Sequence, residues 1–185
     1  VVTITARITG IDGDNVDTAN LMYRKDTDPQ GPWSNALMLD DGDRGDAVAG
    51  DGTYTVMVPA IDAPPFAEGD VMEFRIDVSD AHGSRTYPAT HRAGAPDPWS
   101  YFCKFGEDMQ TDVAYRGEYR TFHLLMTEVN KVAFQTNIYF IPGGAFDCTL
   151  LFDTTLVTSE GEIFYNSSLR CRGGSSKHYN FGSYR

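Results

Sequence analysis

The chain has 185 residues, 41% of them hydrophobic and 12% aromatic, which is enough to build a folded core, so disorder is not indicated. Its 26 acidic residues outnumber 15 basic ones, and a net charge of −11 argues against nucleic-acid or anionic-membrane partners, because both would be repelled. No apolar run approaches the length needed to cross a bilayer, so no membrane span is expected.

Strand patterns dominate the first hundred residues. Residues 1–8 alternate between polar and apolar side chains and are rich in β-branched residues. Residues 71–78 alternate in the same way, which predicts a half-buried strand whose polar face lies in water. Strands at this spacing, with turn residues between them, indicate a mainly β fold built on a β-sandwich. The other strands are expected at 19–24, 33–39, 53–59, 84–88 and 99–105.

An acidic loop separates two of these strands. Four glycines and five aspartates fall between residues 40 and 52, which is typical of a tight turn. Its carboxylates offer hard oxygen ligands at short spacing, so the loop is a candidate Ca²⁺ site. The alternative is that these side chains only accept hydrogen bonds from the loop's own amides. The proposed ligands are Asp41, Asp43, Asp46 and Asp51, with a weaker second group at Asp12, Asp14 and Asp17.

The second half differs in kind, following a segment at 88–98 that is punctuated by proline and glycine. A strand is expected at 119–126, and Thr127 is placed to cap a short helix over 128–135. Residues 137–144 are expected to be loop. Two further strands, 145–152 and 162–172, are expected to form a hairpin around residues 159–161. The region 106–185 is therefore predicted to be a small α+β unit.

Cysteine and glycosylation patterns give two more candidate sites. Three cysteines allow at most one internal disulfide. Cys148 and Cys171 fall at nearly opposed positions of the expected hairpin, so a cross-strand disulfide is reachable, and two buried thiols are the alternative. Cys103 would then be the remaining thiol. Asn166 begins the sequence Asn-Ser-Ser, a possible glycan acceptor.

Several of these motifs together resemble a known combination of domains. The acidic loop resembles one found in extracellular bacterial proteins that carry an immunoglobulin-like domain ahead of a CotH-like (spore coat protein H-like) domain. The resemblance implies an immunoglobulin-like sandwich over 1–105 and the start of a CotH-like domain over 106–185, in a secreted or cell-surface protein. CotH-like kinases bind metal and nucleotide through acidic groups that lie later in their chains, and no counterpart of these groups can be assigned in residues 1–185. The motifs similar to the CotH-like domain are Tyr119-Arg120, Met126-Thr127, residues 162–166, residues 169–173, Ser175-Ser176 and Tyr184-Arg185.

No arrangement of side chains predicts an enzyme, because the four histidines are scattered and no nucleophile or phosphate-loop motif is present. The chain begins at Val1 rather than Met, which we interpret as a processed or truncated product. We therefore expect an extracellular structural protein that assembles with copies of itself into a filament or surface coat. Two alternatives are a truncated part of a CotH-like secreted kinase and a calcium-dependent adhesion module. The strand expected to add to a neighbour's sheet consists of Val1, Val2, Thr3, Ile4, Thr5, Ala6, Arg7 and Ile8.

Overall fold

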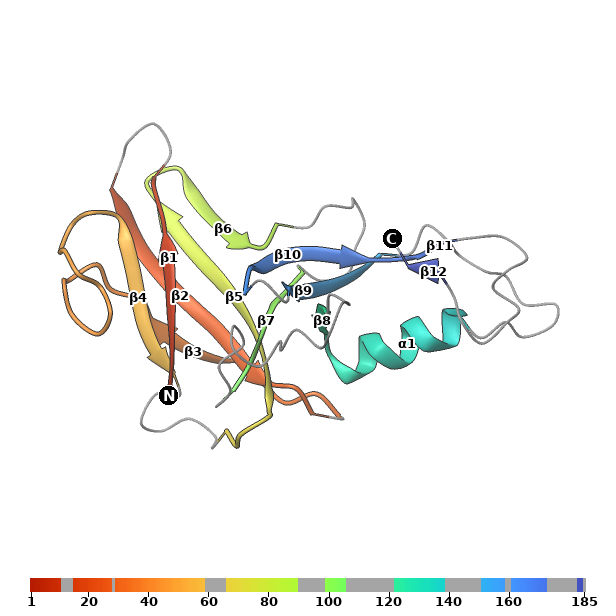
Figure 1. The fold of residues 1–185 in the computed structure, drawn as a ribbon. Helices are drawn as coiled ribbons and strands as arrows, with labels where there is room; N and C mark the ends of the chain where they lie inside the picture. The colour runs from red at the N-terminus through yellow and green to blue at the C-terminus, as the bar shows by residue number, and fades with distance from the viewer. Residues whose placement is uncertain are drawn as a thin grey trace.

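The computed structural model describes residues 1–10, 15–27, 29–58, 66–89, 99–105, 122–138, 151–158, 161–172 and 183–184. The fold is mainly β, as predicted, and its named strands all pair antiparallel (Figure 1). The elements are β1 (Val2–Arg7), β2 (Val16–Lys25), β3 (Ser34–Leu37), β4 (Thr53–Val58), β5 (Val71–Asp80), β6 (Gly83–Tyr87), β7 (Tyr101–Lys104), β8 (Phe122–Leu125), α1 (Glu128–Ile138), β9 (Phe152–Thr158), β10 (Ile163–Leu169), β11 (Cys171–Arg172) and β12 (Ser183–Tyr184).

Two sheets face each other in the N-terminal half. In the described part of the chain, one contains β1 and β4, and the other has the order β3-β2-β5-β6. β5 also pairs with β7, which occupies the first half of the β5 edge, while β6 occupies the second half. The arrangement is sandwich-like, but one sheet has two strands and the other has five. Part of the larger sheet therefore extends beyond the smaller one.

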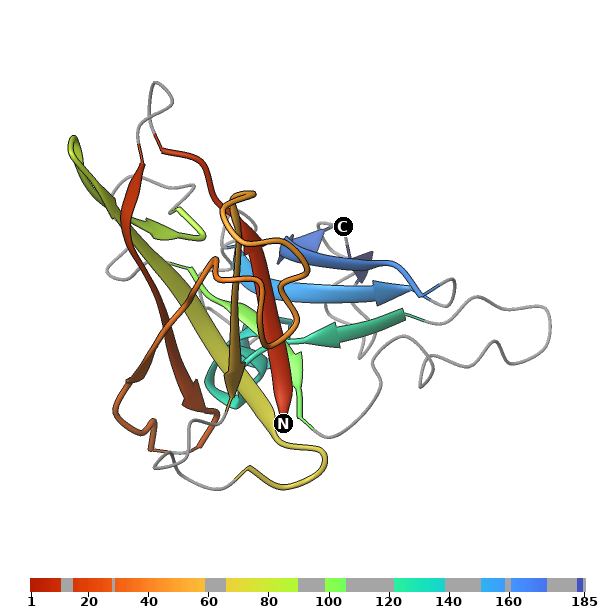
Figure 2. The ribbon, with the colours of Figure 1, turned by 90° about the vertical axis from the view of Figure 1, so that its left-hand side faces the viewer.

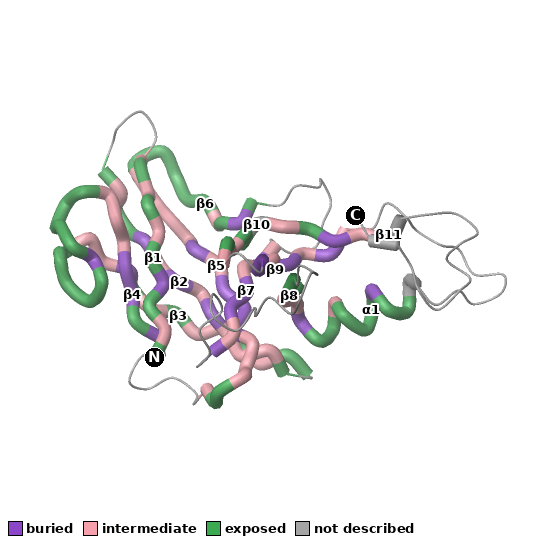
Figure 3. The backbone as a smooth tube through the Cα atoms, in the orientation of Figure 1, coloured by how far each residue is buried: buried purple, intermediate pink, exposed green. Residues whose placement is uncertain are grey.

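The main core lies between these two sheets. Alternating strands send every second side chain inward, so each sheet contributes a row of apolar residues. Figure 3 shows buried residues along β2, β4 and β5 and exposed residues along most of β6. The fully packed members of this core are Ile4, Ala19, Leu21, Tyr23, Met38, Val56, Val58, Met72, Phe74, Ile76 and Cys103.

A second, smaller sheet of order β10-β9-β8 lies beside β7, and α1 adjoins it (Figures 1 and 2). Phe134 of α1 meets Phe152 of β9 edge to face, with ring centroids 5.5 Å apart. The amide of Asn130 donates to the Thr127 hydroxyl at 3.1 Å, which confirms the predicted helix cap. The helix runs to Ile138, three residues beyond its predicted end.

The hairpin in this half is confirmed, but its first strand was predicted too early in the chain. β9 covers Phe152–Thr158 instead of 145–152, and it pairs with β10 around a turn at Gly161, where φ is +82°. The amide of Thr158 donates to the Glu162 carbonyl at 2.9 Å, which closes the turn tightly. Four of the five residues from Thr154 to Thr158 are β-branched, and this segment has strand propensity that the prediction did not use. The proposed domain boundary at residue 105 remains a prediction.

Candidate functional site

The outer edge of β1 is the candidate site for assembly. β1 pairs with β4 of the same chain along its whole length, from Val2 opposite Val58 to Arg7 opposite Thr53. The amide of Ile8 donates to the Gly52 carbonyl at 2.9 Å, which fixes the phase of this ladder. Along a strand of an antiparallel pair, the backbone N–H and C=O groups of successive residues point alternately toward and away from the partner strand. Because Ile8 donates to Gly52, which directly precedes β4, the even-numbered residues of β1 point these groups toward β4.

The odd-numbered residues Thr3, Thr5 and Arg7 consequently turn their backbone N–H and C=O groups away from β4. Within the described ranges, no strand pairs with that side of β1. Their side chains are exposed, whereas Ile4 is buried in the core at 7% exposure. A further strand can thus join this edge without any repacking of the core. The strand predicted at residues 1–8 is confirmed over Val2–Arg7, and its role in assembly remains a prediction.

In the acidic loop, carboxylate side chains accept hydrogen bonds from the backbone amides of the loop itself. Asp40 accepts hydrogen bonds from the amides of Gly50, Asp51 and Gly52 at 2.7, 3.2 and 2.9 Å. Gly52 has a φ of +86°, and a Cβ there would lie 3.2 Å from the Ile8 carbonyl oxygen, so glycine is needed at this position. Asp40 therefore closes the loop at its base.

Asp46 performs the same function inside the loop. Its side chain is buried, with 5% exposure, and accepts from the amides of Gly42 and Val48 at 2.7 and 3.1 Å. Beyond the loop, Leu39 and Thr55 exchange two backbone hydrogen bonds of 2.9 and 2.8 Å, which attach the loop to β4.

The structure groups only part of the predicted calcium ligands. Asp46 and Asp51 come together with Asp40, with one carboxylate oxygen from each within 4.8 Å of the others. Asp41 and Asp43 are outside this group; Asp41 accepts a hydrogen bond from the amide of Asp43, and Asp43 accepts one from the amide of Arg44. Prediction from sequence missed Asp40, although its position directly before the glycine-rich segment was the available signal. Calcium binding remains a prediction. The hydrogen bonds from the loop's backbone amides to its carboxylates agree with the alternative interpretation, in which these side chains only hold the loop's own backbone.

A buried polar network is the feature that sequence reasoning missed. Glu73 was expected on the polar, solvent-facing side of β5, and this was wrong: its exposure is 4%. One carboxylate oxygen accepts from Arg24 Nε at 2.6 Å, and the other accepts from the Ser100 hydroxyl at 2.6 Å. The guanidinium groups of Arg24 and Arg75 lie 4.3 and 4.4 Å from the centroid of the Trp33 ring. Residues distant in sequence cover this face of β5, so its periodicity did not reveal the burial.

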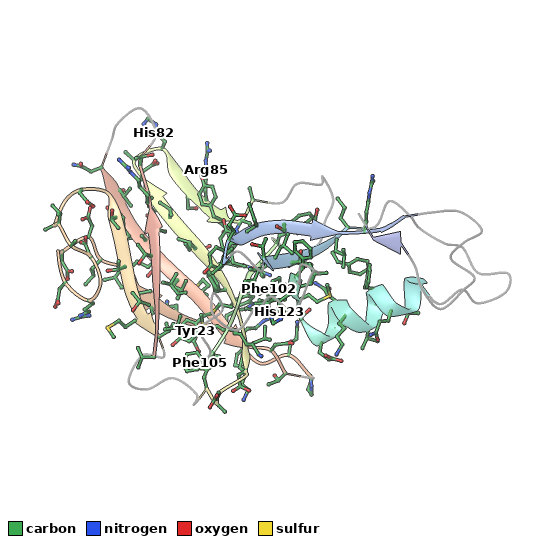
Figure 4. The ribbon with its side chains drawn as sticks, in the orientation of Figure 1. Tyr23, His82, Arg85, Phe102, Phe105 and His123 are labelled. Atoms are coloured by element: carbon green, nitrogen blue, oxygen red, sulfur yellow. The ribbon has the colours of Figure 1, made fainter. Side chains whose placement is uncertain are left out.

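The network continues into the C-terminal half through β9. Asp153 accepts from the amide of Ser100 at 3.1 Å and from the side-chain amide of Asn130 at 2.6 Å. Burial raises the pKa of Asp153, and these hydrogen bonds oppose the shift only in part. In the neighbouring backbone, the amide of Phe102 donates to the Thr155 hydroxyl at 3.0 Å. Polar contacts thus join the five-stranded sheet to β9 and α1 (Figure 4 labels Phe102).

Asp26 adds a contact at the start of α1. It accepts from the Glu128 amide at 2.8 Å, while its other oxygen is buried and has no hydrogen-bond partner among the described residues. Burial raises the pKa of Asp26, with the Glu73 charge as a smaller contribution of the same sign.

We expect Asp26→Asn to change the pH dependence of stability. A folded-state pKa above the unfolded value means that ionised Asp26 opposes folding at neutral pH, and that this penalty is lost as pH falls through the folded pKa. The wild type should therefore gain stability relative to Asp26→Asn between pH 7 and about pH 4. Urea unfolding of both proteins at several pH values measures this difference. A constant difference across the range would contradict the assignment.

The remaining predicted sites are only partly described. Asn166 lies on β10, but its side chain is outside the described set, as is Cys148. Cys171 lies opposite Tyr184 in the β11–β12 pair. The glycan and the disulfide thus remain predictions, as does the second acidic group, of which only Asp17 is described. Cys103 is a buried free thiol whose pKa burial raises to about 12.

Comparisons with protein-family models, curated proteins and solved structures gave no match. The architecture therefore defines the class to which the protein is assigned: a mainly β, sandwich-like protein. In the described ranges α1 is the sole helix, and its 11 residues are too few to cross a membrane. The immunoglobulin-like and CotH-like resemblances remain predictions.

Proposed function

We propose that the protein is a non-catalytic, extracellular structural protein whose copies assemble into a filament or surface coat through the outer edge of β1. The observation that carries this proposal is the row of outward-facing backbone groups at Thr3, Thr5 and Arg7. Open strand edges of this kind pair readily with strands of other chains. The extracellular location is part of the proposal and comes from the sequence resemblance.

The outer edge of β8 offers a second strand edge that can pair with β1, because no strand in the described part of the chain pairs with it. The Thr158 amide donates to Glu162 on the β10 side of β9, so Val157 turns its backbone groups toward β8. In β8, Phe122 and Leu124 then direct their backbone groups away from β9. Both side chains are also exposed, Phe122 at 55%. β1 of one copy pairing with β8 of the next is a head-to-tail contact, which propagates a filament when it does not close into a ring.

Proline substitution tests this assembly without disturbing the core. Thr5→Pro removes an outward N–H and leaves the β1–β4 ladder intact, because proline is tolerated on an exposed strand edge. Deletion of residues 1–8 would instead remove the buried Ile4 and confuse unfolding with lost assembly. We expect Thr5→Pro to be monomeric by light scattering and to show no filaments by negative-stain microscopy. Thr5→Ala, which keeps the N–H, should assemble like the wild type.

The head-to-tail arrangement also predicts that assembly depends on the outer edge of β8. Leu124→Pro should also block assembly, because it removes an outward N–H of β8. An equal mixture of Thr5→Pro and Leu124→Pro should give dimers, since each variant retains the edge that the other lacks. Unfolding midpoints near that of the wild type serve as the control for both variants. A wild type that stays monomeric at high concentration, or unchanged filaments of Thr5→Pro, would contradict the proposal.

A further inference from the structure

A cavity of about 390 Å³ lies between β1 and the turn that joins β5 to β6. It exists because the two-stranded sheet stops at β1, while the facing sheet continues to β6. Its apolar lining comes from Ile76 and Val78 of β5, Tyr87 of β6 and Tyr101 of β7. The volume is within the range of pockets that bind ligands.

The inner face of β6 is uncovered at this cavity. Val78 and Ile76 point into the sandwich, and their partners on β6 are Arg85 and Tyr87, which therefore point to the same side. Yet Tyr87 is 41% exposed and Arg85 is also exposed. In a sandwich this face is normally covered by another strand of the opposite sheet. The missing position is the one directly beside β1.

The edge and the cavity are thus parts of one surface. A strand paired with the outward groups of Thr3, Thr5 and Arg7 would send its inward side chains over Val78 and Tyr87. β6 of the five-stranded sheet already faces the inward side of such a strand, so the strand does not have to bring a second sheet to cover its inward side chains. A single extended segment can therefore occupy this position.

The charges at the cavity favour a particular peptide chemistry. The first 105 residues hold 17 acidic and 8 basic side chains, but Arg7 and Arg85 both line this cavity. His82 lies beside them, at the turn end of β6 (Figure 4). Asp80 is the carboxylate of the lining, and it accepts from the His82 amide at 2.8 Å. No ion pair in the described part of the chain involves Arg85.

We propose that this surface binds an extended acidic segment of another protein, which adds as a strand beside β1. The inward side chains of the segment lie over Val78, Tyr87 and Arg85, so this face carries apolar residues and a carboxylate for Arg85. Its outward side chains alternate with them and place carboxylates beside Arg7. Main-chain hydrogen bonds supply affinity, and the cavity with its two arginines supplies the sequence preference. This inference uses the same outer edge of β1 as the proposed function. It rests on the proposed function only in requiring that this edge can accept another strand.

Fluorescence polarisation with the labelled peptide Glu-Val-Glu-Val-Glu-Glu-Glu tests the proposal on the full chain. As a strand, this peptide carries two valines and one glutamate on its inward face and glutamates on its outward face. The peptide should bind Leu124→Pro, whose β1 edge is intact, and a matched peptide with lysine for glutamate should bind at least about tenfold more weakly. Arg85→Glu should weaken the acidic peptide by a similar factor and reverse the preference. Lys131→Glu, the same charge change on α1, should have no effect.

Thr5→Pro separates strand addition from simple charge attraction. It should reduce peptide affinity about tenfold or more, and Thr5→Ala should not. Equal binding of the two peptides, or equal binding by Thr5→Pro and Thr5→Ala, would overturn the inference. Its failure is distinct from failure of the proposed function, because filaments without peptide binding refute only the inference. Peptide binding by a wild type that never assembles refutes only the proposed assembly.

Discussion

Glu73→Gln should lower the free energy of unfolding by about 3 kcal/mol, the largest single effect that we expect from the described contacts. The side chains of Arg24 and Arg75 are each 14% exposed, and Arg75 Nη2 lies 3.8 Å from a Glu73 oxygen. Neutralising Glu73 removes the carboxylate charge that both guanidinium groups face in a largely dry site. Glutamine would also place an amide donor at one of the two oxygen positions, where it faces the N–H of Arg24 or the hydroxyl of Ser100.

The size of this effect depends on burial, and a matched variant tests that dependence. Glu128→Gln removes the same charge from an ion pair with Lys131 at 3.0 Å, but these side chains are 54% and 52% exposed. Water screens that pair, so its loss should cost less than about 1 kcal/mol. Urea denaturation of both variants measures the comparison. Equal losses for the two variants would show that the Glu73 network contributes no more than a surface pair.

Asp40→Ala should produce the second large loss, about 2 kcal/mol in the free energy of unfolding. One carboxylate accepts from three amides at the base of the acidic loop, and charge-assisted hydrogen bonds are stronger than neutral ones. The full value of three such bonds is not expected, because the loop is partly exposed and water replaces some of them. Hydrogen exchange should increase at Gly50 and Gly52 in this variant.

The control for this change is Asp41→Ala in the same loop. Asp41 accepts from the single amide of Asp43 at 3.1 Å in an exposed turn, so its removal should cost less than about 1 kcal/mol. Unfolding of the wild type in Ca²⁺ and in EGTA tests the calcium prediction separately. An ion that binds only the folded state raises the unfolding midpoint, and the gain in stability grows with the logarithm of the free ion concentration above the dissociation constant. Equal midpoints would contradict the calcium prediction and leave amide capping as the role of these carboxylates.

Local sequence patterns predicted most of the elements in the N-terminal half. Alternation over residues 1–8 and 71–78 gave β1 and β5, because a strand facing a core must place apolar side chains at every second position. Thr127 marked the start of α1 for an equally local reason, since its hydroxyl accepts an amide three residues later. The clustering of aspartate and glycine likewise indicated a loop held by its own side chains.

The sequence by itself thus determined the strands and turns of the N-terminal half and the start of α1, because those depend on neighbours a few residues apart, whereas β9 was placed too early. Only the tertiary structure decided which carboxylates meet in the acidic loop and that the polar face of β5 is covered at Glu73. It also decided that β1 pairs with β4 and leaves its other edge open beside an uncovered β6. Periodicity identifies a face of a strand, but segments far away in the chain determine what covers that face.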